Sequence, residues 1–129
     1  MDLPDYLPTI PAFLHAIAAR FGAREAIRRG GASLSFAELE SRSASVARSL
    51  LAHGMAKGTR VGVLMAPDCD YVAILFAIAR GGGVAVPLST LYQAPELGSV
   101  ITNADLEHLI ISDSFLNHDY LARLEAAVP

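Results

Sequence analysis

The sequence contains few of the residue types that functional sites often use. Its 129 residues include one cysteine, one lysine and no tryptophan. The single cysteine, Cys69, excludes an intramolecular disulfide bond and fits a reducing, cytoplasmic setting. Because Lys57 is the only lysine, any phosphate site that depends on a lysine must use this one position.

The chain also lacks a large excess of charge of either sign. Ten basic and 13 acidic residues are spread along the chain and give a net charge of −3. Nucleic acids and anionic membranes attract clustered basic residues, so we expect neither as a partner. Since 53% of the residues are hydrophobic, the composition predicts a folded chain rather than a disordered one. At this length we expect a single domain over residues 1–129.

No hydrophobic run is long enough to cross a membrane. The longest, residues 71–79, would span only about 13 Å as a helix, against a hydrocarbon core of about 30 Å. Arg80 follows it directly, so the run predicts a buried helix. The N-terminus carries Asp2 and Asp5 and no basic residue before an apolar stretch, which does not fit a signal peptide. We therefore expect a cytoplasmic protein without a membrane span.

The first half of the chain predicts a helix, a hairpin and a second helix. Pro11 and the helical spacing of apolar residues indicate a helix over Ile10–Phe21. Gly30-Gly31 suits a two-residue turn between strands at residues 26–29 and 32–34. Ser35 and Glu38 form a capping-box pattern, which predicts a helix to about His53. We expect its apolar stripe to cover a sheet; the stripe consists of Leu39, Val46, Ala47 and Leu50.

The second half alternates strands and helices three times. The expected pairs are residues 61–65 and 69–80, 84–87 and 95–104, and 109–112 and roughly 116–127. These strands are short and uniformly apolar, as strands buried on both faces are. Strands that are joined by helical crossovers run parallel. The sequence therefore predicts an α/β fold: a layered, mostly parallel sheet with helices on both faces and an N-terminal β-hairpin.

Ligands of such sheets bind beyond the carboxyl ends of the strands, and the obvious phosphate-binding residues lie elsewhere. The glycines at residues 81–83 precede a strand, whereas a phosphate cradle needs them between a strand and the next helix. We interpret them as a closely packed turn. Lys57 also precedes a strand and is expected to be a solvated turn residue. Arg60 and Arg80 lie on the same side as Lys57.

The remaining candidates each have a simpler structural explanation. Asp68 and Asp70 follow a predicted strand and are either acids of a site or carboxylates that favour a helix start. Cys69 is a small buried hydrophobe or, less commonly, a reactive thiol. The histidines show no zinc-ligand spacing; they are His15, His53, His108 and His118. We therefore assign no catalytic, cofactor-binding or metal-binding residue.

Five motifs in a fixed order resemble the opening of the acyl-adenylate-forming superfamily, which includes acyl-CoA synthetases, firefly luciferase and the adenylation domains of peptide synthetases. Thr59 stands where the family usually has aspartate. The motifs are Ser35-Phe36-Ala37-Glu38-Leu39, Lys57-Gly58-Thr59-Arg60-Val61, residues 66–71, residues 73–87 continuing to Pro95-Glu96-Leu97, and residues 109–113.

The resemblance implies an AMP-forming acid–thiol ligase. Members join a carboxylic acid to ATP, release pyrophosphate, and pass the acyl group to the thiol of CoA or a carrier protein. This chain would be the first part of the large N-terminal domain, and the family's nucleotide-binding motifs and adenylating lysine lie after the matched region. The resemblance implies ATP, Mg and CoA for the parent protein. We expect the 129 residues alone to bind no cofactor, to be inactive, and to self-associate where partner layers are missing.

A second hypothesis remains open, a self-standing binding or regulatory module of the flavodoxin or receiver type. A receiver uses a lysine at the ligand edge, where Lys57 is not expected. A flavin binder would place a Ser/Thr/Gly-rich loop after the first parallel strand, where this chain has Met65-Ala66-Pro67-Asp68.

Overall fold

A three-stranded parallel sheet forms the centre of the chain. The structure, a computed structural model, describes residues 2–112, 114–115 and 118–128. Strand β3 (Arg60–Leu64) lies between β4 (Val84–Pro87) and β5 (His108–Ile111). In this register Val61 pairs with Ala85 on one side and with His108 on the other. The predicted parallel strands are confirmed within a residue at each end.

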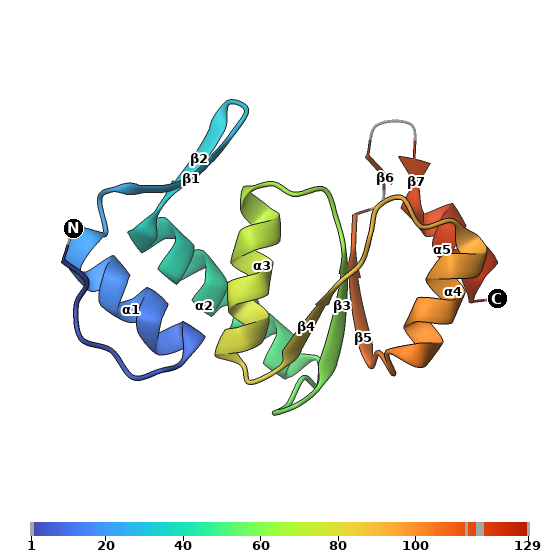
Figure 1. Cartoon of the computed structure of the whole chain (residues 1–129), viewed down its shortest axis with the longest axis horizontal. Coiled ribbons are helices and arrows are strands. Elements are labelled where there is room, and N and C mark those ends of the chain that lie inside the picture. Colours follow the sequence, from blue (N-terminus) through green and yellow to red (C-terminus); the bar gives the residue numbers. More distant parts are fainter. Residues whose placement is uncertain (1, 113, 116–117, 129) are drawn as a thin grey trace.

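Helices cover both faces of this sheet, as predicted. Figure 1 shows α3 (Cys69–Arg80) on one side, and α4 (Ala94–Asn103) with α5 (Tyr120–Ala127) on the other. Val61 and Val63 point to the α3 side, where Ile78 is fully buried with them. The next residue, Leu64, points the opposite way and packs with Leu97 and Tyr120. Apolar side chains on both faces of β3 therefore explain the uniformly apolar strand.

The N-terminal hairpin forms its own two-stranded sheet. Helix α1 (Ile10–Phe21) leads to β1 (Glu25–Arg29) and β2 (Ala32–Ser35), which pair antiparallel. Gly30 has φ = +59°, the left-handed conformation that the turn requires and that glycine adopts without strain. The next helix, α2 (Phe36–Ala52), begins at the predicted capping box, with both hydrogen bonds formed between Ser35 and Glu38 at 3.1 and 2.7 Å.

The prediction that α2 covers a sheet holds only for the small hairpin sheet. Its stripe packs mainly against α1 and α3, and Leu39 lies in a cluster with Leu14, Ala73 and Leu34 of β2. Helix α3 already occupies that face of the parallel sheet, so α2 forms a further layer outside it (Figure 1). Of the predicted stripe, only Leu50 packs against the apolar cluster between α3 and the parallel sheet.

The last helix begins later than predicted. Asp119 caps α5 by accepting a hydrogen bond from the Ala122 amide at 3.0 Å, which fixes the first helical residue at Tyr120. Before it, β6 (Ser114–Phe115) and β7 (His118–Asp119) pair antiparallel. Two-residue strands leave no periodic pattern in a sequence, which explains the error. The predicted helical positions 116 and 117, and Asp113 of the last motif, lie outside the described residues.

Candidate functional site

Three loops meet at the carboxyl edge of the parallel sheet, where a ligand of this architecture would bind. They follow β3 at residues 65–68, β4 at residues 88–93 and β5 from Ser112 onward. Figure 1 shows the ends of these strands on one side of the molecule, with β6 and β7 beside the loop that leaves β4. The loops after β3 and β4 contain neither glycine nor lysine. Loops without glycine and lysine do not make a phosphate cradle.

The two aspartates at this edge have structural roles. The Asp68 carboxylate accepts a hydrogen bond from the Tyr71 amide at 2.9 Å and caps α3. Asp70 accepts from the Arg42 guanidinium at 2.8 Å, which links α3 to α2 on the exposed surface. Of the two interpretations left open by the sequence, the geometry supports the helix-start role for Asp68. Asp70 is an exposed ion-pair partner.

An arginine that the sequence did not reveal holds the loop after β4. Nη1 of Arg123 donates to the carbonyl oxygens of Thr90 at 3.1 Å and Tyr92 at 2.9 Å. Nη2 lies 2.7 Å from Nδ1 of His118. The sequence gives no local sign of this cluster, because the carbonyls are more than 30 positions away. An arginine on a short amphipathic helix is also typical of a solvated face.

Lys57 and the three glycines lie at the opposite edge, as predicted. The Gly58 amide donates to the Gly82 carbonyl at 2.8 Å, so the turns before β3 and β4 contact each other. A Cβ at Gly83 would lie 2.9 Å from Sδ of Met55, closer than real Cβ atoms approach other atoms. The glycine run is therefore a closely packed turn, as the sequence predicted.

Cys69 is only 6% exposed and packs in the cluster with Leu14 and Leu39. The interpretation as a small buried hydrophobe is confirmed.

The four histidines lie on separate elements. Nδ1 of His53 donates to the Ser49 carbonyl at 2.8 Å at the end of α2, and His108 is part of β5. His15 is on α1, and His118 on β7. In the part of the chain that the structure describes, no three His, Cys, Asp or Glu side chains are grouped so that they could hold a metal ion. No helix among these residues is long and apolar enough to cross a membrane.

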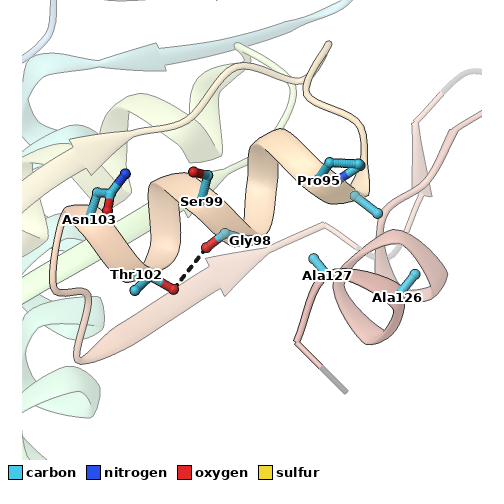
Figure 2. A pocket seen from close by; sticks show the side chains of 8 residues that line it. Pro95, Gly98, Ser99, Thr102, Asn103, Ala126 and Ala127 are labelled. Atoms are coloured by element: carbon cyan, nitrogen blue, oxygen red, sulfur yellow. Dashed lines mark hydrogen bonds between the residues drawn. The ribbon is translucent and has the colours of Figure 1, made fainter.

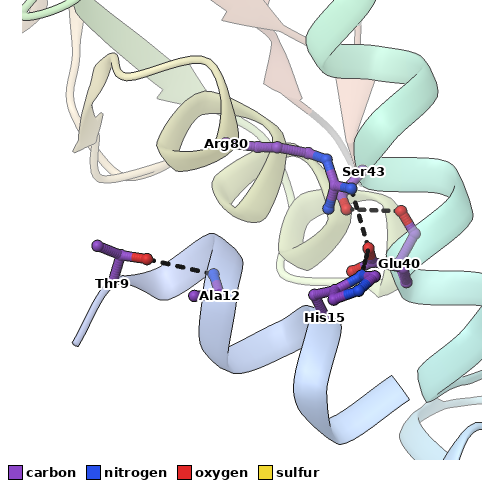
Figure 3. Close-up of polar contacts among 6 residues, drawn as sticks. All are labelled: Thr9, Ala12, His15, Glu40, Ser43 and Arg80. Carbon is purple, nitrogen blue, oxygen red and sulfur yellow. Dashed lines mark hydrogen bonds and ion pairs between the residues drawn. The ribbon is translucent and has the colours of Figure 1, made fainter. Parts of the chain in front are cut away.

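Glu40 is the centre of a polar cluster that joins the first three helices. Figure 3 shows Arg80 and His15 converging on it, with distances to Oε1 of 2.9 and 3.1 Å. Burial raises the pKa of the Glu40 carboxyl, but the hydrogen bonds and charge interactions with Arg80 and His15 together outweigh burial and leave the pKa below its ordinary value. Ser43, one turn later, donates to the Glu40 carbonyl at 3.0 Å. The cluster fixes how α1, α2 and α3 pack.

A shallow hollow of about 510 Å³ lies between α4 and the end of α5 (Figure 2). Its lining side chains are small and uncharged, and the Thr102 hydroxyl donates to the Gly98 carbonyl at 3.0 Å. A Cβ at Gly98 would lie 2.9 Å from the Ala127 carbonyl oxygen, so glycine permits the close approach of the two helices. The hollow offers no acid, base or cation.

The same arrangement of elements occurs in solved adenylate-forming enzymes. VinN in complex with 3-methylaspartate superimposes with a TM-score of 0.82 at 24% identity, over 97% of this chain and 33% of that one. The anthranilate CoA ligase AuaEII in complex with anthranoyl-AMP gives 0.83 at 22% identity, over 97% of this chain and 23% of that one. At these identities the likeness shows the fold. The class is therefore the α/β fold that these two enzymes share with this chain.

Sequence comparison gives the family. The model of the AMP-binding enzyme family matches residues 14–129, and the chain belongs to this family. Syringomycin synthase SyrB1 from Pseudomonas syringae pv. syringae is 34% identical over 107 residues, which cover 80% of this chain and 17% of that protein. The acyl-CoA ligase SID4 from Ajellomyces capsulatus is 36% identical over 91 residues, 70% of this chain and 15% of that protein. The chain thus spans less than a fifth of the length of these relatives.

The family resemblance and the α/β fold predicted from the sequence are confirmed. The relatives include both peptide synthetases and acyl-CoA ligases, so the family alone does not select the acceptor. The comparisons do not favour the alternative of a flavodoxin-like or receiver-like module.

Proposed function

We propose that this chain is one α/β subdomain that builds the first part of the N-terminal domain of an ATP-dependent carboxylic acid ligase. The observation that carries the proposal is the family match, which covers residues 14–129 and therefore runs from within α1 to the end of α5. The parent protein would activate an acid as its acyl-AMP and transfer the acyl group to a thiol.

For the thiol we propose CoA, with a carrier protein as the second candidate. SID4 and the Aspergillus fumigatus protein sidI, both similar to this chain, are named acyl-CoA ligases. The carrier-protein alternative draws support from the adenylation enzyme NpsA, which has been solved as an artificial fusion with a PCP domain. NpsA matches this chain with a TM-score of 0.79.

The residues that the structure describes at the carboxyl edge do not form a site for ATP or its magnesium ion. The loops at the carboxyl edge lack glycine and lysine, and Asp68 and Asp70 are engaged in a helix cap and an ion pair. We therefore assign no step of the reaction to these residues. Their role is to hold the sheet and its carboxyl edge in place for groups supplied elsewhere in the parent.

The reading frame after Pro129 provides the test. We expect it to continue into a Ser/Thr/Gly-rich loop ending in lysine, and we expect the extended protein to catalyse acid-dependent ATP–pyrophosphate exchange. A panel of fatty, aryl and amino acids would identify the substrate class, and omission of the acid is the control. An extended protein with that loop but no exchange with any acid of the panel would contradict the ligase. A stop codon at Pro129 would favour a self-standing module.

A further inference from the structure

Arg123 connects two segments of the carboxyl edge that are far apart in the sequence. One is the loop at residues 88–93, which follows β4, and the other is the start of α5 with β7 before it. The guanidinium group donates to two carbonyls of the loop and contacts His118 of β7, and its central carbon lies 5.2 Å from the ring centroid of Tyr120. One half-buried side chain therefore touches loop, strand and helix.

Apart from the packing of Tyr92 against the core cluster, the outer part of the loop has few contacts that fix it. Leu88 anchors its beginning in the core at 7% exposure, whereas Leu91 is 75% exposed. Within the loop, the amides of Leu91 and Tyr92 donate to the hydroxyl and the carbonyl of Ser89, both at 3.2 Å. These local bonds shape the turn but do not attach it to another element. The bonds from Arg123 do.

The contact with His118 determines the state of that ring. A guanidinium group has donors only, so Nδ1 of His118 must accept the hydrogen bond at 2.7 Å. A ring that accepts at Nδ1 is neutral and carries its proton on Nε2. The ring also stacks on Tyr120, with centroids 6.0 Å apart and planes 10° apart. His118 thus holds Nη2 of Arg123 in place.

We propose that Arg123 is a positioning residue that fixes the 88–93 loop and so sets the shape of the carboxyl edge. Its importance for a ligand rests on the proposed function, whereas the attachment of the loop does not. Arginine suits the task because its planar group directs separate N–H donors at three acceptors at once. A lysine has one nitrogen and cannot bond both carbonyls and the imidazole in this geometry.

Amide hydrogen exchange, followed by NMR on the 129-residue chain, tests the proposal. We expect Arg123→Lys to accelerate exchange at Leu91 and Tyr92 about tenfold or more, because charge-assisted hydrogen bonds to the loop are lost. Arg60→Lys is the matched control, since Arg60 is half-exposed and pairs with Asp105 at the opposite edge at 3.4 Å. The amides of β3 should stay protected in both variants.

The ring nitrogens of His118 give a second readout that a merely structural role would not change. We expect ¹⁵N shifts of the Nε2–H tautomer in the unchanged chain and a tautomer mixture in Arg123→Lys. Unchanged exchange of the loop amides, or an unchanged tautomer, would overturn the proposal. Both measurements need no ATP or acid. They therefore fail or succeed independently of the ligase activity of the parent.

A second pair of variants decides the question if Arg123→Lys unfolds the chain. His118→Asn keeps an acceptor close to the position of Nδ1, and His118→Phe keeps only the stacked ring. We expect loop exchange close to that of the unchanged chain for His118→Asn and several-fold faster exchange for His118→Phe. Equal rates in the two variants would contradict the role of Arg123.

Discussion

Glu40 and Gly83 illustrate how single residues determine the packing of this chain. Glu40 is mostly buried between three helices, and its contacts with Arg80 and His15 lower the pKa of its carboxyl. Gly83 is required because Met55 and Ile78 occupy the space that a side chain would fill. Both roles depend on contacts between positions that are distant in the sequence.

Replacing Glu40 with glutamine should make the free energy of unfolding less sensitive to pH in the acid range. The pKa of Glu40 is lower in the folded chain than its ordinary value of 4.5, so the unfolded chain binds the proton more readily. The stabilisation is therefore fully present above about pH 4.5 and is lost as the pH falls through the lower, folded-state value. We expect Glu40→Gln to cost about 1 kcal/mol at neutral pH and less near pH 3.

Urea unfolding at both pH values measures this difference. Glu125→Gln, at an exposed position of α5, is the control and should change stability little at either pH. An equal cost of Glu40→Gln at neutral and acidic pH would show that the carboxylate is not stabilised as the geometry indicates.

Replacing Gly83 with alanine should destabilise the chain by about 1–3 kcal/mol, as overpacking does. The new Cβ would lie 2.9 Å from Met55 Sδ and 3.0 Å from Ile78 Cγ2. Gly31→Ala is the matched control because a Cβ there meets no atom within 4 Å and its φ is not positive. Thermal unfolding compares the two variants. If Gly83→Ala were as stable as Gly31→Ala, the packing interpretation of the glycine run would be wrong.

At the scale of elements, local signals in the sequence predicted most helices and strands. Caps, turn glycines and apolar runs act within a few residues, and the bounds of α1, α3 and β4 were predicted without error. The partner of α2 was not predictable, because an apolar stripe shows that a helix is buried but not against which element. The late start of α5 depends on Asp119, whose capping role competes with a helical pattern that begins earlier.

The capping box of α2 gives a prediction at this scale. Ser35→Ala should cost about 1 kcal/mol, because the Glu38 amide loses its acceptor at the helix start. Ser41→Ala, at an exposed position of the same helix, should be neutral or slightly stabilising, since alanine favours helices. Urea midpoints of the two variants test this expectation. If Ser41→Ala destabilised the chain as much as Ser35→Ala does, loss of the helix cap could not be the cause of the destabilisation.

At the scale of the whole molecule, the sequence predicted the fold class and which candidates lie away from the ligand edge. Lys57 and the glycine run were placed correctly because parallel strands put all turns before strands on one side. The attachment of the loop by Arg123 could not be predicted, since it joins residues 31 and 33 positions apart without any local pattern.

Exposed apolar groups at the sheet edge predict self-association of the isolated chain. Strands β4 and β5 are the outer strands of the parallel sheet among the described residues, and Val84 of β4 is 48% exposed. Open strand edges with apolar side chains pair with other chains. Sedimentation equilibrium should give an average mass above 13.6 kDa that rises with concentration. We expect Val84→Lys to reduce the rise, and a strictly monomeric chain at high concentration would contradict this expectation.

We propose that these 129 residues form the scaffold of an adenylate-forming ligase and carry none of its chemistry. Acid-dependent ATP–pyrophosphate exchange by the isolated chain tests this claim most directly. We expect no exchange above the acid-free control with any fatty, aryl or amino acid, because the loops that follow β3 and β4 contain neither glycine nor lysine. Exchange that requires the acid and is catalysed by this chain alone would contradict it.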